Sequence, residues 1–529
     1  AAAKCQGQAV FGIDVDLPDA LTAVVVRCPH FGGSLTGFDS TAARELPGLV
    51  DVFEIHSGIA VVAHSYWKAR KAAEALVVRW DKGPLAGVDS AEIRRRQESE
   101  LAHGEPSDSK EHGNAPKALA RASEVLEATY AAPLAPHATL EPQNCTAIIR
   151  PDGAEVWAPT QGPATVRLVF SHYADVPQDQ VEVHTTYMGG AFGRRGHVDF
   201  AAEVGAIAGH MRGQPIKLIW SREDDLQHDF YRPSTLHKLR AGKDKNGDFT
   251  AWEHHFVSPS FVETILPNLG AALPTWVPTE ASRSVGTKAK EWIKGIDPTM
   301  SDGAHLPYAI ANTQVAVHPF DIGIPKGFWR SVGHSHNAFV VEGFIDELAH
   351  ASGQDPVSYR LALLGSHPRH RAVLERAVAE ANWGEPDPGR FQGVAVHKSF
   401  GSFVAHVAEV SVFENTYHVE RIISAVDCGL IINPDIVRQQ IEGAVLYGLS
   451  VALMDPITIE DGAVAQHNFD DAPVLRFHQS PAIEVHFIDS DEAPTGVGEI
   501  GLPPAAPAVA NALFAATGQR LRELPLRLA

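Results

Sequence analysis

The sequence MGGAFGRRG at Met188–Gly196 is the strongest local pattern in the chain. It follows a predicted strand at Val181–Met188 and precedes a predicted helix at His197–Met211. Glycines let the backbone approach a ligand closely, and a helix N-terminus presents free N–H groups to an anion. The two arginines add charge-assisted donors for phosphate. The pattern therefore predicts either an anion-binding turn or a tightly packed connection between strand and helix.

The spacing of these glycines disfavours the common nucleotide-binding motifs. No Gly-x-Gly pair opens the stretch, as the dinucleotide fingerprint requires, and the Lys-Ser/Thr pair of a P-loop is missing. An NAD-dependent dehydrogenase is therefore the disfavoured alternative.

Four further motifs place polar residues beside glycine or proline. GVGEIGLPP at Gly496–Pro504 holds a single carboxylate, Glu499, just before an apolar stretch. Such a carboxylate is either a general base or a solvated helix cap. The other three motifs would each be unremarkable alone: TQGP at Thr160–Pro163, GFWRSVG at Gly327–Gly333, and DCGLIINPD at Asp427–Asp435 continuing to QQIEGA at Gln439–Ala444.

Length and composition limit the class of protein. The 529 residues suggest three or four domains, and the net charge of −20 argues against nucleic acid as a partner. No apolar run of about 18 residues predicts a membrane helix. Thiolates that hold zinc or an iron–sulfur cluster are clustered. The four cysteines are too widely spaced for either: Cys5, Cys28, Cys145 and Cys428.

Hydrophobic periodicity predicts alternating strands and helices in three segments. The polar stretch Ala102–Ala115 is predicted to be a linker or exposed loop. Residues Asn268–Leu306 are rich in proline and glycine without a clear period, and long irregular loops are often functional. Trp276 in this loop could stack on a flat ring, although packing is its commoner role.

Taken in this order, the five motifs resemble the xanthine dehydrogenase and aldehyde oxidase family of molybdenum hydroxylases. The resemblance covers nearly the whole chain, and the Gly-Phe-Trp-Arg and Gly-Val-Gly-Glu forms point to the branch of isoquinoline 1-oxidoreductase beta subunits and aldehyde dehydrogenases. It implies a mixed α/β (α+β) fold. The implied divisions are an α/β hammerhead domain at 1–88, a linker at 89–116, and two molybdopterin-binding domains at 117–350 and 351–529.

The resemblance also implies roles for individual residues. Glu499 matches the catalytic base, and Gln161 would hydrogen-bond the apical oxygen of molybdenum. No side chain would ligate the metal, because the dithiolene of molybdopterin cytosine dinucleotide holds it. The remaining residues expected to contact the cofactor are Gly189, Gly190, Ala191, Phe192, Gly193, Arg194, Arg330, Gln440 and Gly498.

The implied activity oxidises an aldehyde to a carboxylic acid or hydroxylates an N-heteroaromatic carbon with oxygen from water. Electrons would pass to a small partner subunit with two [2Fe-2S] clusters, and a cytochrome c is a further acceptor that the resemblance allows. The family's Gly-Gln-Gly segment is missing from this sequence. A separate polypeptide or an upstream segment would supply it. The alternative is a non-catalytic assembly subunit, against which Glu499 in its full motif argues. The compartment, cytoplasmic or periplasmic, stays open.

Overall fold

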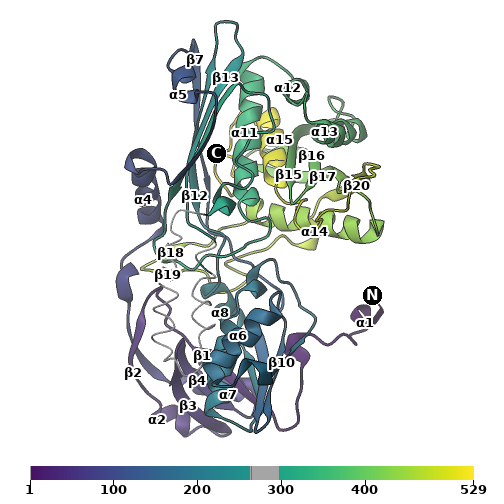
Figure 1. Ribbon diagram of the computed structural model, residues 1–529. Coiled ribbons are helices and arrows are strands. Elements are labelled where there is room, and N and C mark those ends of the chain that lie inside the picture. Colours follow the sequence, from purple (N-terminus) through teal and green to yellow (C-terminus); the bar gives the residue numbers. More distant parts are fainter. Residues whose placement is uncertain (1, 262–263, 265–296) are drawn as a thin grey trace.

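The computed structural model describes residues 2–261, 264 and 297–529, and Figure 1 shows three main sheets with helices packed against them. The first sheet has seven strands in the order β10-β9-β8-β11-β1-β4-β3. Their bounds are Val181–Thr185, Gly153–Ala158, Asn144–Arg150, Ile216–Ile219, Leu21–Val26, Gly58–Ala63 and Leu49–Ile55. Strand β1 pairs in parallel with β11, so strands of the expected hammerhead segment and of the following segment share one sheet.

Both faces of this sheet are covered, which explains why β1 and β4 are apolar at successive positions. Val25 and Val62 pack towards helices α6 (Pro163–Ala174) and α7 (Asp199–His210). Val24 and Val61 point to the opposite face, where helix α3 (Tyr66–Glu74) covers them. The alternation follows from the two-residue period of a strand.

The second sheet has five strands in the order β6-β14-β13-β12-β7. Their bounds are Asp108–His112, Asn312–Pro319, Phe249–Ser258, Thr235–Lys243 and Glu124–Ala132. The prediction of a loop throughout Ala102–Ala115 was wrong, because strand β6 pairs with β14 along the edge. A polar sequence can form an edge strand since one side of it stays in water. Helix α4 (Ser90–His103) occupies much of the rest of the expected linker.

The third sheet has four strands in the order β15-β16-β17-β20. Their bounds are Arg390–Ser399, Ser402–Phe413, Thr416–Asp427 and Ala482–Phe487. Helix α15 (Ala505–Thr517) packs directly on β15. The contact is so close that a Cβ at Gly393 would lie 2.1 Å from the Ala512 nitrogen. Two short pairs complete the strands: β2 (Ser34–Asp39) with β5 (Val77–Asp81), and β18 (Ile459–Glu460) with β19 (Ala463–Val464).

Helices α11 (His334–Ala351) and α14 (Pro434–Leu453) carry residues towards the candidate site. Among the helices of the described residues, none is long and apolar enough to cross a membrane. The other α-helices of the described residues are α1 (Ala2–Cys5), α2 (Thr41–Arg44), α5 (Ala115–Leu119), α8 (Arg222–Gln227), α12 (Pro356–Leu363) and α13 (Pro368–Glu380).

Candidate active site

The glycine-rich turn after β10 is shaped by close packing against the chain at Phe328. Gly193 has φ of +109°, and a Cβ at this position would lie 1.4 Å from the Phe328 carbonyl oxygen. Only glycine fits here, which is the physical reason for the Phe-Gly pair. Phe192 itself has φ of +55°, in the left-handed region that side chains rarely adopt.

The two arginines of this turn are buried inside the protein. Arg194 donates to both carboxylate oxygens of Asp199, at 2.9 and 2.8 Å, and its Nε lies 3.2 Å from Asp229. Arg195 donates to the Glu141 carbonyl at 2.8 Å and to the Gly190 carbonyl at 2.8 Å. Both side chains therefore hold the turn in shape. Both side chains are 0% exposed, so their donors are used within the protein, and the expected contact of Arg194 with a cofactor stays a prediction.

The carboxylate of Glu499 is held on one oxygen only. The Ser331 backbone N–H donates to Glu499 Oε1 at 3.0 Å, and the Ser331 hydroxyl donates to the Glu499 carbonyl at 2.7 Å. Glu499 Oε2 has no hydrogen-bond donor among the described residues, and the side chain is half-buried. Ser331 adopts φ of +74°, a strained conformation often kept at functional sites. The arrangement presents a fixed carboxylate with one oxygen available.

Arg330 contacts two other residues that are expected to bind a cofactor, Gly498 and Gln440. Its Nε donates to the Gly498 carbonyl at 2.8 Å, and its Nη2 lies 3.3 Å from Gln440 Oε1. Burial lowers the pKa of Arg330, while Tyr447 and Glu499 oppose the shift. Among the described residues, no carboxylate lies within ion-pair distance of this guanidinium. A buried cation without a carboxylate partner is costly, and an anionic ligand would compensate it.

Three aromatic rings connect this group to the glycine-rich turn. Phe192 stacks on Tyr447 with ring centroids 4.3 Å apart, and Trp329 stacks on the same tyrosine at 4.8 Å. The Arg330 guanidinium lies 5.8 Å from the Phe192 ring centroid. No motif of the sequence indicated Tyr447, although it lies seven residues after Gln440 in α14 and so shares its face of the helix.

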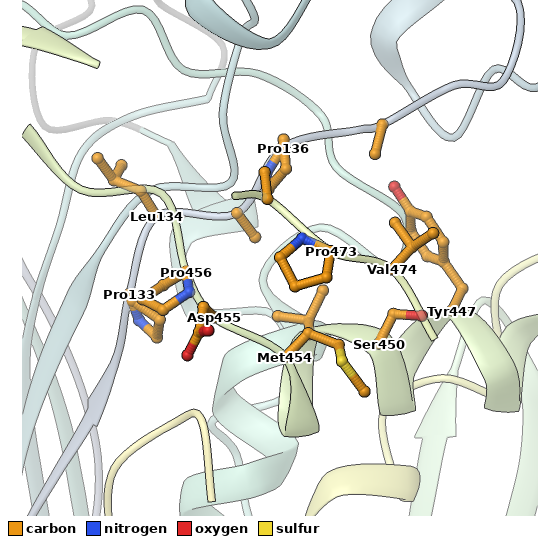
Figure 2. A pocket seen from close by; sticks show the side chains of 14 residues that line it. Pro133, Leu134, Pro136, Tyr447, Ser450, Met454, Asp455, Pro456, Pro473 and Val474 are labelled. Carbon is orange, nitrogen blue, oxygen red and sulfur yellow. The ribbon is translucent and has the colours of Figure 1, made fainter. Parts of the chain in front are cut away.

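Beside Tyr447 lies a small apolar cavity of about 40 Å³, shown in Figure 2. Its walls come from the segment 133–138, the C-terminal half of α14 and the segment 472–474, with Pro136, Met454 and Pro473 among the labelled side chains. Few polar atoms face this cavity, so it does not contribute to the chemistry at Glu499.

Gln161 contacts the glycine-rich turn through its side chain and its backbone. Its Oε1 accepts from the Gly193 N–H at 3.2 Å, and its backbone N–H donates to the Arg195 carbonyl at 3.0 Å. The side chain is exposed, and within the described ranges its Nε2 has no acceptor. Gly189 donates its N–H to Glu141 Oε2 at 2.7 Å, and the Ala191 carbonyl accepts from the Arg194 N–H. These backbone groups of Gly189 and Ala191 therefore bond within the protein and stabilise the turn.

These donors fit a molybdenum–pterin group. Amide N–H groups from Gln161 and Gln440 and the uncompensated charge of Arg330 suit an anionic, oxygen-rich ligand. In the part of the chain that the structure describes, one group of three residues could ligate a metal, and it lies on β9 and β10: Glu155, Glu182 and His184. This group lies on the strands of the first sheet and includes none of the residues expected to contact the cofactor.

Two further expectations concern the predicted pocket loop and the four cysteines. Residues 268–296 of the expected pocket loop, including Trp276, lie outside the described residues. The four cysteines are free and scattered, with Cys145 and Cys428 buried.

Comparisons with known proteins identify the family of this chain. Two models of the molybdopterin cofactor-binding domain match residues 97–260 and 369–481, together more than half of the chain. The isoquinoline 1-oxidoreductase subunit beta of Brevundimonas diminuta is 31% identical over 99% of this chain, which spans 66% of that relative's length. A membrane-bound aldehyde dehydrogenase (pyrroloquinoline-quinone) of Gluconacetobacter polyoxogenes is 28% identical over 99% of the chain, which spans 70% of its length.

The fold is shared with solved structures of the same kind. The quinoline 2-oxidoreductase of Pseudomonas putida 86 superposes with a TM-score of 0.78 at 13% identity, covering 99% of this chain and 95% of that one. The chain belongs to the molybdopterin-binding large subunits of the molybdenum hydroxylase family. This membership confirms the family and the mixed α and β fold class expected from the motifs.

Proposed function

We propose that this chain is the catalytic subunit of a molybdenum hydroxylase that oxidises an aldehyde or hydroxylates an N-heteroaromatic carbon. The proposal rests on the carboxylate of Glu499. Its Oε1 accepts a hydrogen bond from the Ser331 N–H, and its Oε2 is available to accept a proton. The names of the two relatives support the two substrate classes, isoquinoline for one and aldehyde for the other.

The residues that would hold molybdopterin cytosine dinucleotide are those with unused donors. Gln161 and Gln440 offer amide N–H groups, and Arg330 offers a buried positive charge. When bound, the cofactor supplies the metal that accepts two electrons from the substrate. The expected domain boundaries at 88, 116 and 350 stay part of this proposal.

The chain's own residues would handle proton transfer and orientation. Glu499 Oε2 accepts the proton from a water-derived nucleophile, while Ser331 keeps the carboxylate pointed at it. A positioned general base contributes about 10²–10⁴-fold to such a reaction. Arg330 fixes the carbonyl of Gly498 and thereby the backbone next to the base. Phe192 and Tyr447 stack beside these groups and exclude water from one side.

Electrons must leave through another polypeptide. The four free cysteines are scattered, so we propose a small partner subunit that carries two [2Fe-2S] clusters. A cytochrome c is a further acceptor that this route allows. A polypeptide segment with the missing Gly-Gln-Gly sequence would complete the cofactor site.

The test is to purify the complex, measure molybdenum and cytosine nucleotide per chain, and assay aromatic aldehydes and isoquinoline-type heterocycles with an artificial electron acceptor. We expect molybdenum in stoichiometric amount and turnover of one substrate class. A quinone cofactor in place of molybdenum would contradict the proposal. Molybdenum without turnover of any substrate would favour the alternative of a non-catalytic assembly subunit.

A further inference from the structure

Three large aliphatic side chains next to the candidate active site are exposed. Leu430, Ile432 and Ile436 keep 53%, 77% and 54% of their surface in contact with solvent. They lie in the loop between β17 and α14 and in the first turn of α14. Ile431, between the first two, packs against the main core, so the loop directs alternate side chains inward and outward. We call the three exposed residues the aliphatic patch.

The backbone that carries the aliphatic patch is tied down. Arg369 donates twice to Asp427 at the start of the loop, with both distances 2.7 Å. The Leu430 N–H donates to the Glu492 carbonyl at 2.9 Å. Asn433 accepts from the Ile436 N–H at 3.1 Å and so caps α14. The exposure is therefore built into an ordered loop, and an ordered apolar surface beside a site is typical of an interface.

The aliphatic patch is continuous with the candidate active site. Ile436 lies one helical turn before Gln440, and Gln440 Oε1 lies 3.3 Å from the Arg330 guanidinium. Leu430 bonds to Glu492, at the start of the loop that leads to Gly498 and Glu499. An anionic cofactor does not complement aliphatic side chains, so a polypeptide is the matching occupant.

We infer that the aliphatic patch is the docking surface for the polypeptide segment that the longer relatives carry beyond the region spanned here. The isoquinoline relative is matched over 66% of its length, so the rest of it has no counterpart in this chain. The inference rests on the proposed function, because that segment would close the cofactor site beside Gln440 and Glu499. Gln440 is exposed and Glu499 is half-buried in this chain.

The test is photo-cross-linking from position 432 in the purified complex. A benzophenone amino acid replaces Ile432, and mass spectrometry identifies the cross-linked peptide. We expect a peptide homologous to the unmatched part of the isoquinoline relative. A cross-link to an iron–sulfur polypeptide, a cross-link to a second copy of this chain, or no cross-link would overturn the inference. The control carries the same amino acid at Phe413, which is 68% exposed at the β16–β17 turn and should not cross-link to that segment.

A charge variant gives a second measurement. Ile432→Asp should reduce retention of the segment and molybdenum per chain by about tenfold or more, as for loss of an apolar contact at an interface. Ile432→Val should retain both, and Phe413→Asp should match the unmodified protein. If the complex holds molybdenum but the cross-link lies elsewhere, the docking inference is wrong and the proposed function stands. If the segment docks and the unmodified complex holds no molybdenum, the proposed function is wrong and the docking inference stands.

Discussion

Arg194 and Arg330 are both buried beside aromatic rings, Arg194 near Trp220 and Phe230 and Arg330 near Phe192 and Tyr447, yet their polar partners differ. Arg194 is 0% exposed and has two carboxylate partners, Asp199 and Asp229. Arg330 is 7% exposed and contacts carbonyl and amide oxygens only. The first arginine is neutralised within the fold and supports its shape. The second keeps a positive charge that a ligand can use, so the partner of an arginine tells more about its role than its motif does.

The largest expected effect is on the carboxylate next to Arg330. Glu499→Gln keeps the side-chain shape and the bond from Ser331 but removes the proton acceptor. We expect turnover to fall by about 10²–10⁴-fold, because that is the usual contribution of a general base. Molybdenum content and thermal unfolding should stay as in the unmodified protein. Turnover that is unchanged in this variant would remove Glu499 from the proposed chemistry.

The second effect contrasts the two arginines directly. Arg194→Met removes the arginine partner of two carboxylates, Asp199 and the buried Asp229, and breaking a buried ion pair in this way costs about 3–5 kcal/mol of unfolding free energy. Arg330→Met leaves no carboxylate behind and should cost about 1 kcal/mol for each hydrogen bond lost. Denaturant unfolding of the two variants measures the difference.

Molybdenum content distinguishes the same two variants, and here the larger effect is expected for Arg330→Met. Arg330→Met should retain its fold and lose most of its molybdenum, since an anionic ligand would lose its cation. If both variants unfold at the same denaturant concentration, the distinction between a structural and a ligand-binding arginine is wrong.

Parts of this contrast could be predicted from the sequence. The glycine spacing correctly indicated a tight turn, because Gly193 allows no Cβ there. Glu499 stood out as a lone carboxylate among glycines. The burial of Arg194 and Arg195 could not be predicted, since their partners Asp229 and Glu141 come from loops that are distant in the sequence.

Tertiary contacts also explain the other misses. Ser331 and Glu499 are 168 residues apart, and no local pattern pairs them. Strand β6 is polar because it lies at an edge, so its sequence looks like a loop. The order of five motifs identified the family, although each motif alone was compatible with ordinary packing.

Acid should lower the free energy of unfolding, because it protonates a buried imidazole that contacts the loop carrying Glu499. His406 is 0% exposed and lies 2.7 Å from the Gly501 carbonyl, and burial lowers its pKa from 6.5 to about 4. The folded state therefore binds fewer protons than the unfolded state between these values. This stability is fully present above about pH 6.5 and is lost as the pH falls towards 4, by about 3 kcal/mol in total.

The measurement is the free energy of unfolding at several pH values for the unmodified protein and for His406→Gln. Glutamine can still donate to the Gly501 carbonyl but does not titrate. The variant should lose less stability between pH 6.5 and 4 than the unmodified protein, and equal losses would remove His406 as the cause. Other buried histidines contribute to the acid sensitivity of both proteins, so the difference between the two curves is the informative quantity.

The smallest expected effect is at Ser331, which combines a hydroxyl contact to Glu499 with a strained backbone. Ser331→Ala and Ser331→Gly both remove the hydroxyl and keep the N–H that holds Oε1. Both should lower kcat about fivefold, equivalent to about 1 kcal/mol, with unchanged molybdenum content. Only glycine adopts φ of +74° without steric cost. The free energy of unfolding of the glycine variant should therefore be about 1 kcal/mol higher than that of the alanine variant. A kcat that follows stability across the two variants, instead of being equal, would mean that Ser331 acts through the backbone conformation and not through its hydroxyl.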